Sequence, residues 1–470
     1  LSAGGRPDEA VSLLEDKNRS LPNADLLRAR EVIIRTRLGE PARAAALTIE
    51  RLGASPRGIA DSIELADAYF NAGLFAEAAD TIQGGLPTDI PLTSEQSAAA
   101  LSVLSAVKVE EVMAGDEVQG EAALRIFDAL VSRGVQPAPA SYLLRVLVLC
   151  ARHPGESERL LAAAREAAAR TGQPELQMLG RVAQALLDQP DPSAALRFLG
   201  AVVNSVRPYN EAFAFNWFRF TAARGDAEDI RFLTTGVVQP AEMVKVIATQ
   251  FSGDDEHLGT EAEQRSEIAY WAGNGASQFG RENVAEAAYR IALEIKPDHP
   301  WALNNLGYML LENGREFDEA ERMIAEAYRA LPHESSVIDS MGWVRYKQGI
   351  FNDTAGPDGL PIRGAASLIR EAVDSGVREA NYEQADHLGD VLWRIGDHEE
   401  AKRRWVQARN LLQVIMTNLN ARNPDETPNR ARYETSLAQV EAKLRAVEEG
   451  KPPPVAPTQA EFDAQHLTPK

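Results

Sequence analysis

Apolar residues recur along most of the chain at the three-and-four spacing of an amphipathic helix, and short turns separate these stretches. The segment 121–130 is typical, because its apolar positions fall together on one helical face. The pattern predicts an all-α protein in which nearly every segment between turns is helical.

Glycine and alanine repeat on top of this pattern with a period of 34 residues. Gly5, Gly39 and Gly73 lie 34 apart, and an alanine follows each of them after five residues. Further along, four glycines are each followed seven residues later by another: Gly273 and Gly280, Gly307 and Gly314, Gly342 and Gly349, and Gly389 and Gly396. A fixed period of this length indicates a repeat architecture.

Each glycine pair predicts a helical hairpin. The first glycine lets two antiparallel helices approach closely, and the second ends the first helix in the left-handed conformation. Small residues at Ala285, Ala320 and Ala401 are expected at the helix crossing. We expect the larger residues four positions later, Tyr289, Ile324 and Trp405, to fill the space between hairpins.

This pattern resembles the tetratricopeptide repeat. Gly273, Ala285, Tyr289, Ala292 and Pro297 match the family's positions at the right offsets. The resemblance is strong over 266–412 and extends to 1–85, and the units at 339–344 and 387–393 look like repeats of bacterial cell-envelope proteins. It implies a right-handed α-solenoid in which the first helix of each repeat lines the concave face.

The repeat pattern also divides the chain. We predict N-terminal repeats over 1–85 (the first one truncated), divergent helical hairpins over 86–260, a regular array over 261–415 with an inserted loop at 352–361, a C-terminal capping helix over 424–450 and a disordered proline-rich tail over 451–470. In the divergent part the expected helix pairs are 94–113 with 120–133, 140–152 with 156–171, 174–188 with 192–205, and 209–224 with 226–235. Since Leu13 and Leu14 lack a covering helix, we expect at least one more helix before Leu1.

Charge and cysteine content narrow the class of partner. The 470 residues include 69 acidic and 49 basic ones, which gives a net charge of −20. Such a surface repels nucleic acid and anionic membranes. The single cysteine, Cys150, ends an apolar run and is expected to be a buried thiol, and no segment predicts a membrane span.

Sequence signatures of catalysis are missing. The chain has no G-x-x-x-x-G-K-[ST], H-E-x-x-H or G-x-S-x-G motif, and its seven histidines are scattered. The acidic loop at 352–361 lacks the twelfth-position glutamate of a calcium-binding EF-hand. We therefore predict a protein that is not an enzyme and has no catalytic, cofactor or metal site.

The leading functional interpretation is a scaffold that binds a peptide or partner protein on its concave face. A helical module of a larger enzyme and an architectural, self-associating solenoid remain as alternatives. A mapped pocket with perturbed titratable groups in 86–260 would favour the enzyme module. Light scattering would detect self-association. The sequence leaves the oligomeric state open. The bacterial periplasm is favoured over the cytoplasm.

The expected binding surface is one stripe of the first helices in 266–396. Its members are Tyr270, Asn274, Trp301, Asn304, Asn305, Tyr308, Asp339, Trp343, Asp386 and Asp390. We expect Trp301, Tyr308 and Trp343 to be exposed, and leave open whether Tyr346 and Trp393 are. Acids and aromatics without lysine or arginine favour a ligand with basic residues between apolar ones.

Some family members bind two carboxylates with lysine and arginine beside two asparagines. Asn274 and Asn305 match the asparagines, but Tyr270, Ser336 and Ser340 stand at the basic positions, so that ligand class is excluded.

Overall fold

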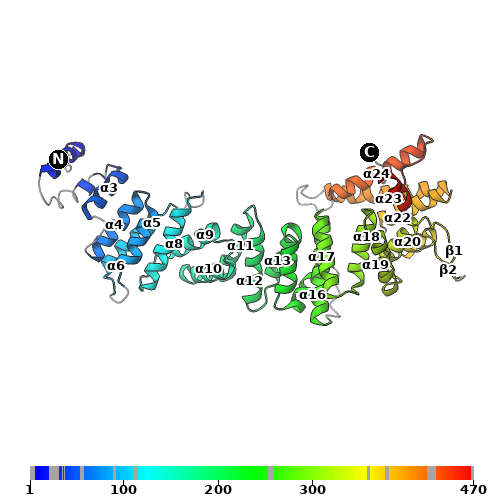
Figure 1. The fold of residues 1–470 in the computed structure, drawn as a ribbon, viewed down its shortest axis with the longest axis horizontal. Helices are drawn as coiled ribbons and strands as arrows, with labels where there is room; N and C mark the ends of the chain where they lie inside the picture. Colours follow the sequence, from blue (N-terminus) through cyan, green and yellow to red (C-terminus); the bar gives the residue numbers. More distant parts are fainter. Residues whose placement is uncertain are drawn as a thin grey trace. The chain divides into compact units, whose positions relative to one another are not determined.

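A computed structural model describes residues 6–20, 31–33, 35, 38–52, 58–87, 91–108, 115–251, 259–356, 360–375, 381–420 and 430–466. In these residues the chain is almost entirely α-helical, which confirms the predicted all-α class (Figure 1). It divides into two compact units, residues 1–202 and 203–470. This division does not coincide with the boundaries that the repeat pattern suggested.

Unit 1, residues 1–202, is a series of helices that mostly pack against their neighbours in sequence. They are α1 (Pro7–Ser20), α3 (Pro41–Leu52), α4 (Ile59–Asn71), α5 (Phe75–Gly85), α6 (Ser94–Ser105), α8 (Glu117–Ser132), α9 (Pro139–Arg152), α10 (Ser157–Thr171), α11 (Glu175–Leu187) and α12 (Ser193–Ser205, which crosses the boundary). Cys150 is buried in α9, as predicted, and burial raises the pKa of its thiol to about 12.

Unit 2, residues 203–470, contains the regular repeats. Its elements are α13 (Glu211–Arg224), α14 (Ala227–Gly236), α15 (Pro240–Phe251), α16 (Glu261–Gln278), α17 (Glu282–Ile295), α18 (Pro300–Glu312), α19 (Phe317–Ala330), α20 (Ser335–Lys347), β1 (Thr354–Ala355), β2 (Pro361–Ile362), α21 (Ala365–Ser375), α22 (Tyr382–Arg394), α23 (His398–Asn420), α24 (Arg430–Glu448) and α25 (Gln459–His466). Helices α16, α18, α20 and α22, the first helices, each pair with the next helix in a hairpin, and α24 packs against α23.

The glycines hold these hairpins together as the sequence predicts. A Cβ atom on Gly273 would lie 2.6 Å from Tyr289, and one on Gly307 would lie 2.8 Å from Ile324. Gly389 is covered in the same way by Trp405. The large residues therefore contact the glycine of their own hairpin.

The second glycine of each pair ends its helix in the left-handed region. The φ angles are 68° at Gly280, 60° at Gly314, 75° at Gly349 and 88° at Gly396. A residue with a Cβ is strained in this conformation, whereas glycine adopts it freely. The second helix begins two residues after Gly280 and Gly396 and three residues after Gly314, whereas the inserted loop after Gly349 delays α21 to Ala365.

The divergent middle of the chain has helices at the places that its periodicity predicts, from α6 to α14. Helix α15 was not anticipated. The inserted loop at 352–361 holds the antiparallel strands β1 and β2 in its described part, with Thr354 paired to Ile362. Residues 357–359 of this loop, and the predicted start of the capping helix at 424–429, lie outside the described residues.

The C-terminal tail differs from the predicted disordered segment. Residues 452–458 have no regular secondary structure and include a tight turn, in which the Val455 N–H donates to the Pro453 carbonyl at 2.9 Å. Pro453 is buried, and α25 forms over Gln459–His466. Thr458 and Glu461 cap this helix, because each side chain accepts a hydrogen bond from the backbone N–H of the other. The tail therefore has its own folding signal, which its proline-rich composition concealed.

The close approach at Gly307 predicts a stability effect. Replacing Gly307 with leucine should destabilise the protein by about 1–3 kcal/mol, because the new side chain would overpack the crossing with Ile324. A urea-unfolding midpoint measures the loss. As a matched control, Gly180→Ala in α11, where an added Cβ meets nothing within 4 Å, should be neutral or stabilising by up to about 1 kcal/mol. Equal effects at the two glycines would contradict the packing.

Candidate functional site

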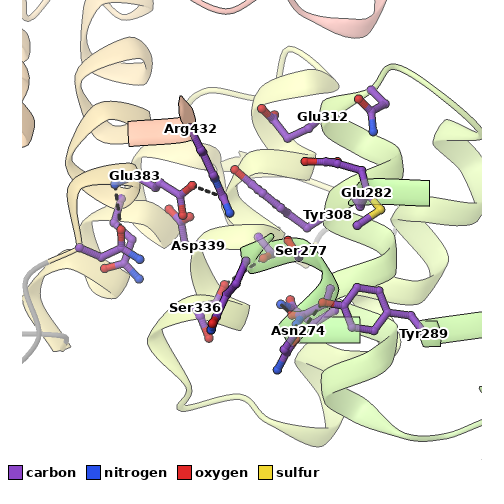
Figure 2. Close-up of a pocket in the computed structure, with 18 of the residues that line it drawn as sticks. Asn274, Ser277, Glu282, Tyr289, Tyr308, Glu312, Ser336, Asp339, Glu383 and Arg432 are labelled. Atoms are coloured by element: carbon purple, nitrogen blue, oxygen red, sulfur yellow. Dashed lines mark hydrogen bonds and ion pairs between the residues drawn. The ribbon is translucent and has the colours of Figure 1, made fainter. Parts of the chain in front are cut away.

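A cavity of about 570 Å³ opens in unit 2 on the first helices (Figure 2). Helices α16, α18, α20 and α22 supply most of its lining, and α24 adds Arg432 and Ser436. Of the predicted stripe, Asn274, Asn304, Asn305, Tyr308 and Asp339 line this cavity. The shared lining follows from the hairpin register, which places equivalent positions of successive first helices beside one another.

An amide network fixes one side of the cavity. The Asn274 side-chain oxygen accepts hydrogen bonds from the Tyr289 hydroxyl at 2.8 Å and from the Asn305 amide at 2.9 Å. Asn304 donates to the Asn305 oxygen at 3.2 Å. The side-chain oxygen of Asn304 itself is buried without a donor, in a residue that is only 5% exposed.

Asp339 and His387 form a buried charged pair at the cavity floor. His387 Nδ1 lies 2.9 Å from Asp339 Oδ2, and His387 Nε2 lies 3.3 Å from the Tyr308 hydroxyl. Desolvation lowers the pKa of His387, but the charges of Asp339, Glu312 and Asp386 and the hydrogen bond to Asp339 outweigh it and raise the pKa to about 9. The other oxygen of Asp339, Oδ1, is buried without a donor.

This pair is arranged like an acid–base dyad but is poorly suited to act as one. A histidine that stays protonated at neutral pH has no free lone pair with which to take up a proton. The ring is also covered, since it stacks on Trp343 at 3.9 Å between centroids. The pair is therefore a structural ion pair between α20 and α22.

Trp343 is buried, which corrects the expectation that it faces the ligand. It is 2% exposed, stacks on Tyr346 as well as on His387, and donates from Nε1 to Glu312 at 2.5 Å. Tyr270 and Tyr346 are also buried. Neighbouring first helices lie close enough for their aromatic rings to stack, so these rings pack against each other and not against solvent.

The remaining stripe residues lie outside the cavity lining. Trp301 is partly buried and packs on the apolar cluster of Leu303, Ala327 and Val337. Trp393 is partly buried and stacks on His398 at 3.9 Å. Asp386 and Asp390 are engaged by Lys443 of α24.

Lys443 is the centre of a buried ion cluster. Its Nζ lies 2.8 Å from Asp386 Oδ1 and 2.7 Å from Asp390 Oδ1, and Asp390 also accepts from Trp405 Nε1 at 3.0 Å. Desolvation lowers the pKa of Lys443, but the two carboxylates outweigh it and raise the pKa. Asp386 and Asp390 thus hold α24 on α22. They lie on the predicted stripe but bind Lys443 of the same chain.

Arg432 is a cavity-lining residue that the sequence pattern did not reveal. It forms an ion pair with Glu383 across the cavity wall at 2.5 Å (Figure 2), and the charge of Glu383 raises its pKa. The predicted stripe contains no basic residue because it was drawn from the first helices alone, whereas Arg432 belongs to α24. Lys443, placed among the apolar positions Val440 and Leu444, was the available signal that one face of α24 contacts acids.

The cavity is acidic overall. Glu282, Glu312, Asp339 and Glu383 line it, against the single cation Arg432. These carboxylates also act on Tyr308. Its pKa lies well above the ordinary value, because burial and the charges of Glu312, Glu383 and Asp339 all raise it. Among the residues that the structure describes, no group of three or more His, Cys, Asp or Glu could hold a metal ion. In the same described part of the chain, no helix is both long and apolar enough to cross a membrane.

Comparison with known proteins supports the repeat assignment. A family model of the tetratricopeptide repeat matches residues 288–322, which run from α17 into α19. The TPR repeat-containing protein PA4667 of Pseudomonas aeruginosa is 33% identical over 105 residues, which are 22% of this chain and 15% of that relative. Both matches confirm tetratricopeptide repeats in the chain, as the glycine and alanine pattern predicted. The repeats indicate a helical module for protein interaction, and the family is generally non-catalytic.

Three solved structures share weak similarity. A MamA RS-1 ArsTM double mutant is 18% identical, covering 40% of this chain and 95% of its own, with a TM-score of 0.25. The structure of Naa15/Naa10 bound to HypK-THB is 12% identical, covering 95% of this chain and 68% of that chain, with a TM-score of 0.30. The APC/C hetero-tetramer Cut9-Hcn1 is 13% identical, covering 93% of this chain and 87% of that chain, with a TM-score of 0.27. Scores this low establish no shared arrangement of the helices.

The Asp339–His387 pair predicts a pH-dependent stability. Because the folded-state pKa of about 9 lies above the ordinary value of 6.5, the stabilisation is complete below pH 6.5 and is lost as pH rises through 9. Urea unfolding of the native chain and of His387→Gln should therefore differ more at pH 6 than at pH 10, by on the order of 3 kcal/mol. A difference that stays constant from pH 6 to pH 10 would show that the pair is not charged.

The Lys443 cluster predicts a large effect of one truncation. Lys443→Ala should destabilise the protein by about 3–5 kcal/mol, because buried Asp390 and half-buried Asp386 would lose their cation. Lys451→Ala is the matched control, since Lys451 is exposed and pairs only with exposed Glu449; it should change stability by less than about 0.5 kcal/mol. Thermal or urea unfolding checks both, and a loss below about 1 kcal/mol for Lys443→Ala would contradict the cluster.

Proposed function

We propose that the tetratricopeptide repeats of unit 2 bind an extended peptide segment of a partner protein, and that this segment brings hydrogen-bond donors and basic side chains into the cavity. The chain acts as a non-catalytic scaffold in this proposal. The supporting observation is a pair of side-chain oxygens, Asn304 Oδ1 and Asp339 Oδ1, which belong to cavity-lining residues and are buried without a donor. A buried acceptor without a donor costs about 1–3 kcal/mol, so a ligand N–H that draws such a side chain toward the cavity and pairs with it is favoured.

The charge around the cavity supports the same ligand class. Of the four carboxylates that line the cavity, Glu383 is paired with Arg432 and Asp339 with His387, whereas Glu282 and Glu312 have no cation among the cavity-lining residues. A lysine or arginine of the ligand would therefore meet uncompensated negative charge, whereas a ligand carboxylate would meet repulsion. The open cavity extends over several helices, which suits a segment of chain better than a small molecule.

A peptide array tests this ligand class. Twelve-residue peptides with one randomised position each are probed with the native protein, and lysine or arginine should be selected over acidic residues. The variant Glu282→Gln with Glu312→Gln removes two cavity charges and should weaken the selected peptides about tenfold, or about 1.4 kcal/mol. Added salt should weaken binding to the native protein more than to this variant.

The matched control removes two charges from second helices. Glu326→Gln in α19 and Asp374→Asn in α21 lie outside the cavity lining and should leave peptide affinity unchanged. Selection of acidic peptides, or equal weakening by the control pair, would rule out binding in the acidic cavity.

A further inference from the structure

The C-terminal tail lies on the first helices in the manner of a bound peptide. Both backbone polar groups of Ala456 are held by side chains: its N–H donates to Asp390 Oδ2 at 2.9 Å, and its carbonyl accepts from the Tyr346 hydroxyl at 2.5 Å and from Arg394 at 3.1 Å. Asp390 and Arg394 belong to α22, and Tyr346 belongs to α20. Contacts to the backbone alone hold this part of the tail without selecting the side chain at that position.

Two side chains beyond Ala456 add specific contacts. Glu461 forms a two-pronged ion pair with Arg394, at 2.8 and 2.6 Å. This hydrogen bond lowers the pKa of Glu461 to about 2. The Phe462 ring lies on Gly314, in the turn after α18, so closely that any Cβ there would collide with it. The tail thus crosses three successive repeats from α22 to α18.

We propose that Tyr346, Asp390, Arg394 and Gly314 form a second peptide-binding site, occupied in this chain by its own residues 453–462, whose external ligand is a non-helical proline-containing segment followed by a helical turn that carries an acidic and an aromatic residue. Prolines favour this occupant because they restrict the backbone of the segment before it binds and so lower its entropy cost. The site requires one carboxylate five residues after the backbone contact, at the position of Glu461.

The attachment of the tail to the chain explains why the site is filled. Only a few residues separate the end of α24 at Glu448 from buried Pro453. A short tether of this kind gives an effective concentration in the millimolar range. An external segment therefore binds well only where the tail has left the site, and the tail would limit which partners gain access.

The inference rests on the proposed function only in that both sites take peptide segments, and it is tested separately with the peptide 451–466 of this chain. In the full-length protein, residues 452–462 are replaced with glycine and serine, which empties the site. The labelled peptide should bind this variant with micromolar affinity and bind the native protein at least tenfold more weakly. The same peptide with Glu461→Lys and Phe462→Ala is the control ligand and should not bind.

Substitutions in the tail-binding site show which of its residues contact the peptide. Arg394→Ala in the replaced chain should weaken the peptide at least tenfold, whereas Arg403→Ala, on exposed Arg403 of α23, should not. If the replaced chain does not fold by circular dichroism, Glu461→Lys with Phe462→Ala in the otherwise native tail serves as the emptied site. No binding to a folded emptied chain, equal binding to the native chain, or indifference to Arg394→Ala would overturn the inference.

These outcomes are independent of the acidic cavity. The array peptides should respond to Glu282→Gln with Glu312→Gln and not to Arg394→Ala, so loss of one binding activity leaves the other measurable.

Discussion

The contact of a large side chain with the bare backbone of a glycine is the constraint on which the regular repeats depend. Tyr289 on Gly273, Ile324 on Gly307 and Trp405 on Gly389 fix how closely the two helices of a hairpin approach and at which residue they cross. Because the crossing point recurs at nearly the same offset, the first helices are presented in matching register. Asn274 and Asn305 are brought within hydrogen-bond distance by this register, since they follow Gly273 and precede Gly307 on adjacent first helices.

The matching register also forces polar groups together between the first helices, and their pairing decides which of them remain available. Asp339 with His387, and Asp386 and Asp390 with Lys443, neutralise charges that would be costly to bury alone. The same pairing leaves Asn304 Oδ1 and Asp339 Oδ1 without donors at the cavity. Helix α24 packs at the end of the array and takes part in the same charge pairing, since it supplies both Lys443 and Arg432.

The fold could be predicted because its signals are local. Paired glycines seven residues apart specify a hairpin whatever its neighbours are, and the left-handed φ at Gly314 follows from a single residue. The site could be predicted only in part, because the exposure of Trp343 depends on how near His387 and Tyr346 lie in the folded chain. Periodicity placed Trp343 on the correct face but could not show that this face is shared with neighbouring helices. The contacts of Arg432 and of the tail join residues far apart in sequence, and composition alone suggested a cap and a disordered end.

The cavity and the tail site are linked through one side chain. Trp343 donates to Glu312, which lines the cavity, and its ring stacks on Tyr346, which holds the tail. On α20 the cavity residue Ser340 and the tail contact Tyr346 are six residues apart, about 9 Å along the helix axis. A ligand of a few residues could therefore occupy the cavity beside the seated tail, whereas a longer extended segment that follows the first helices would have to displace it. The length of the bound segment, and not only its charge, would then determine whether the tail stays in place.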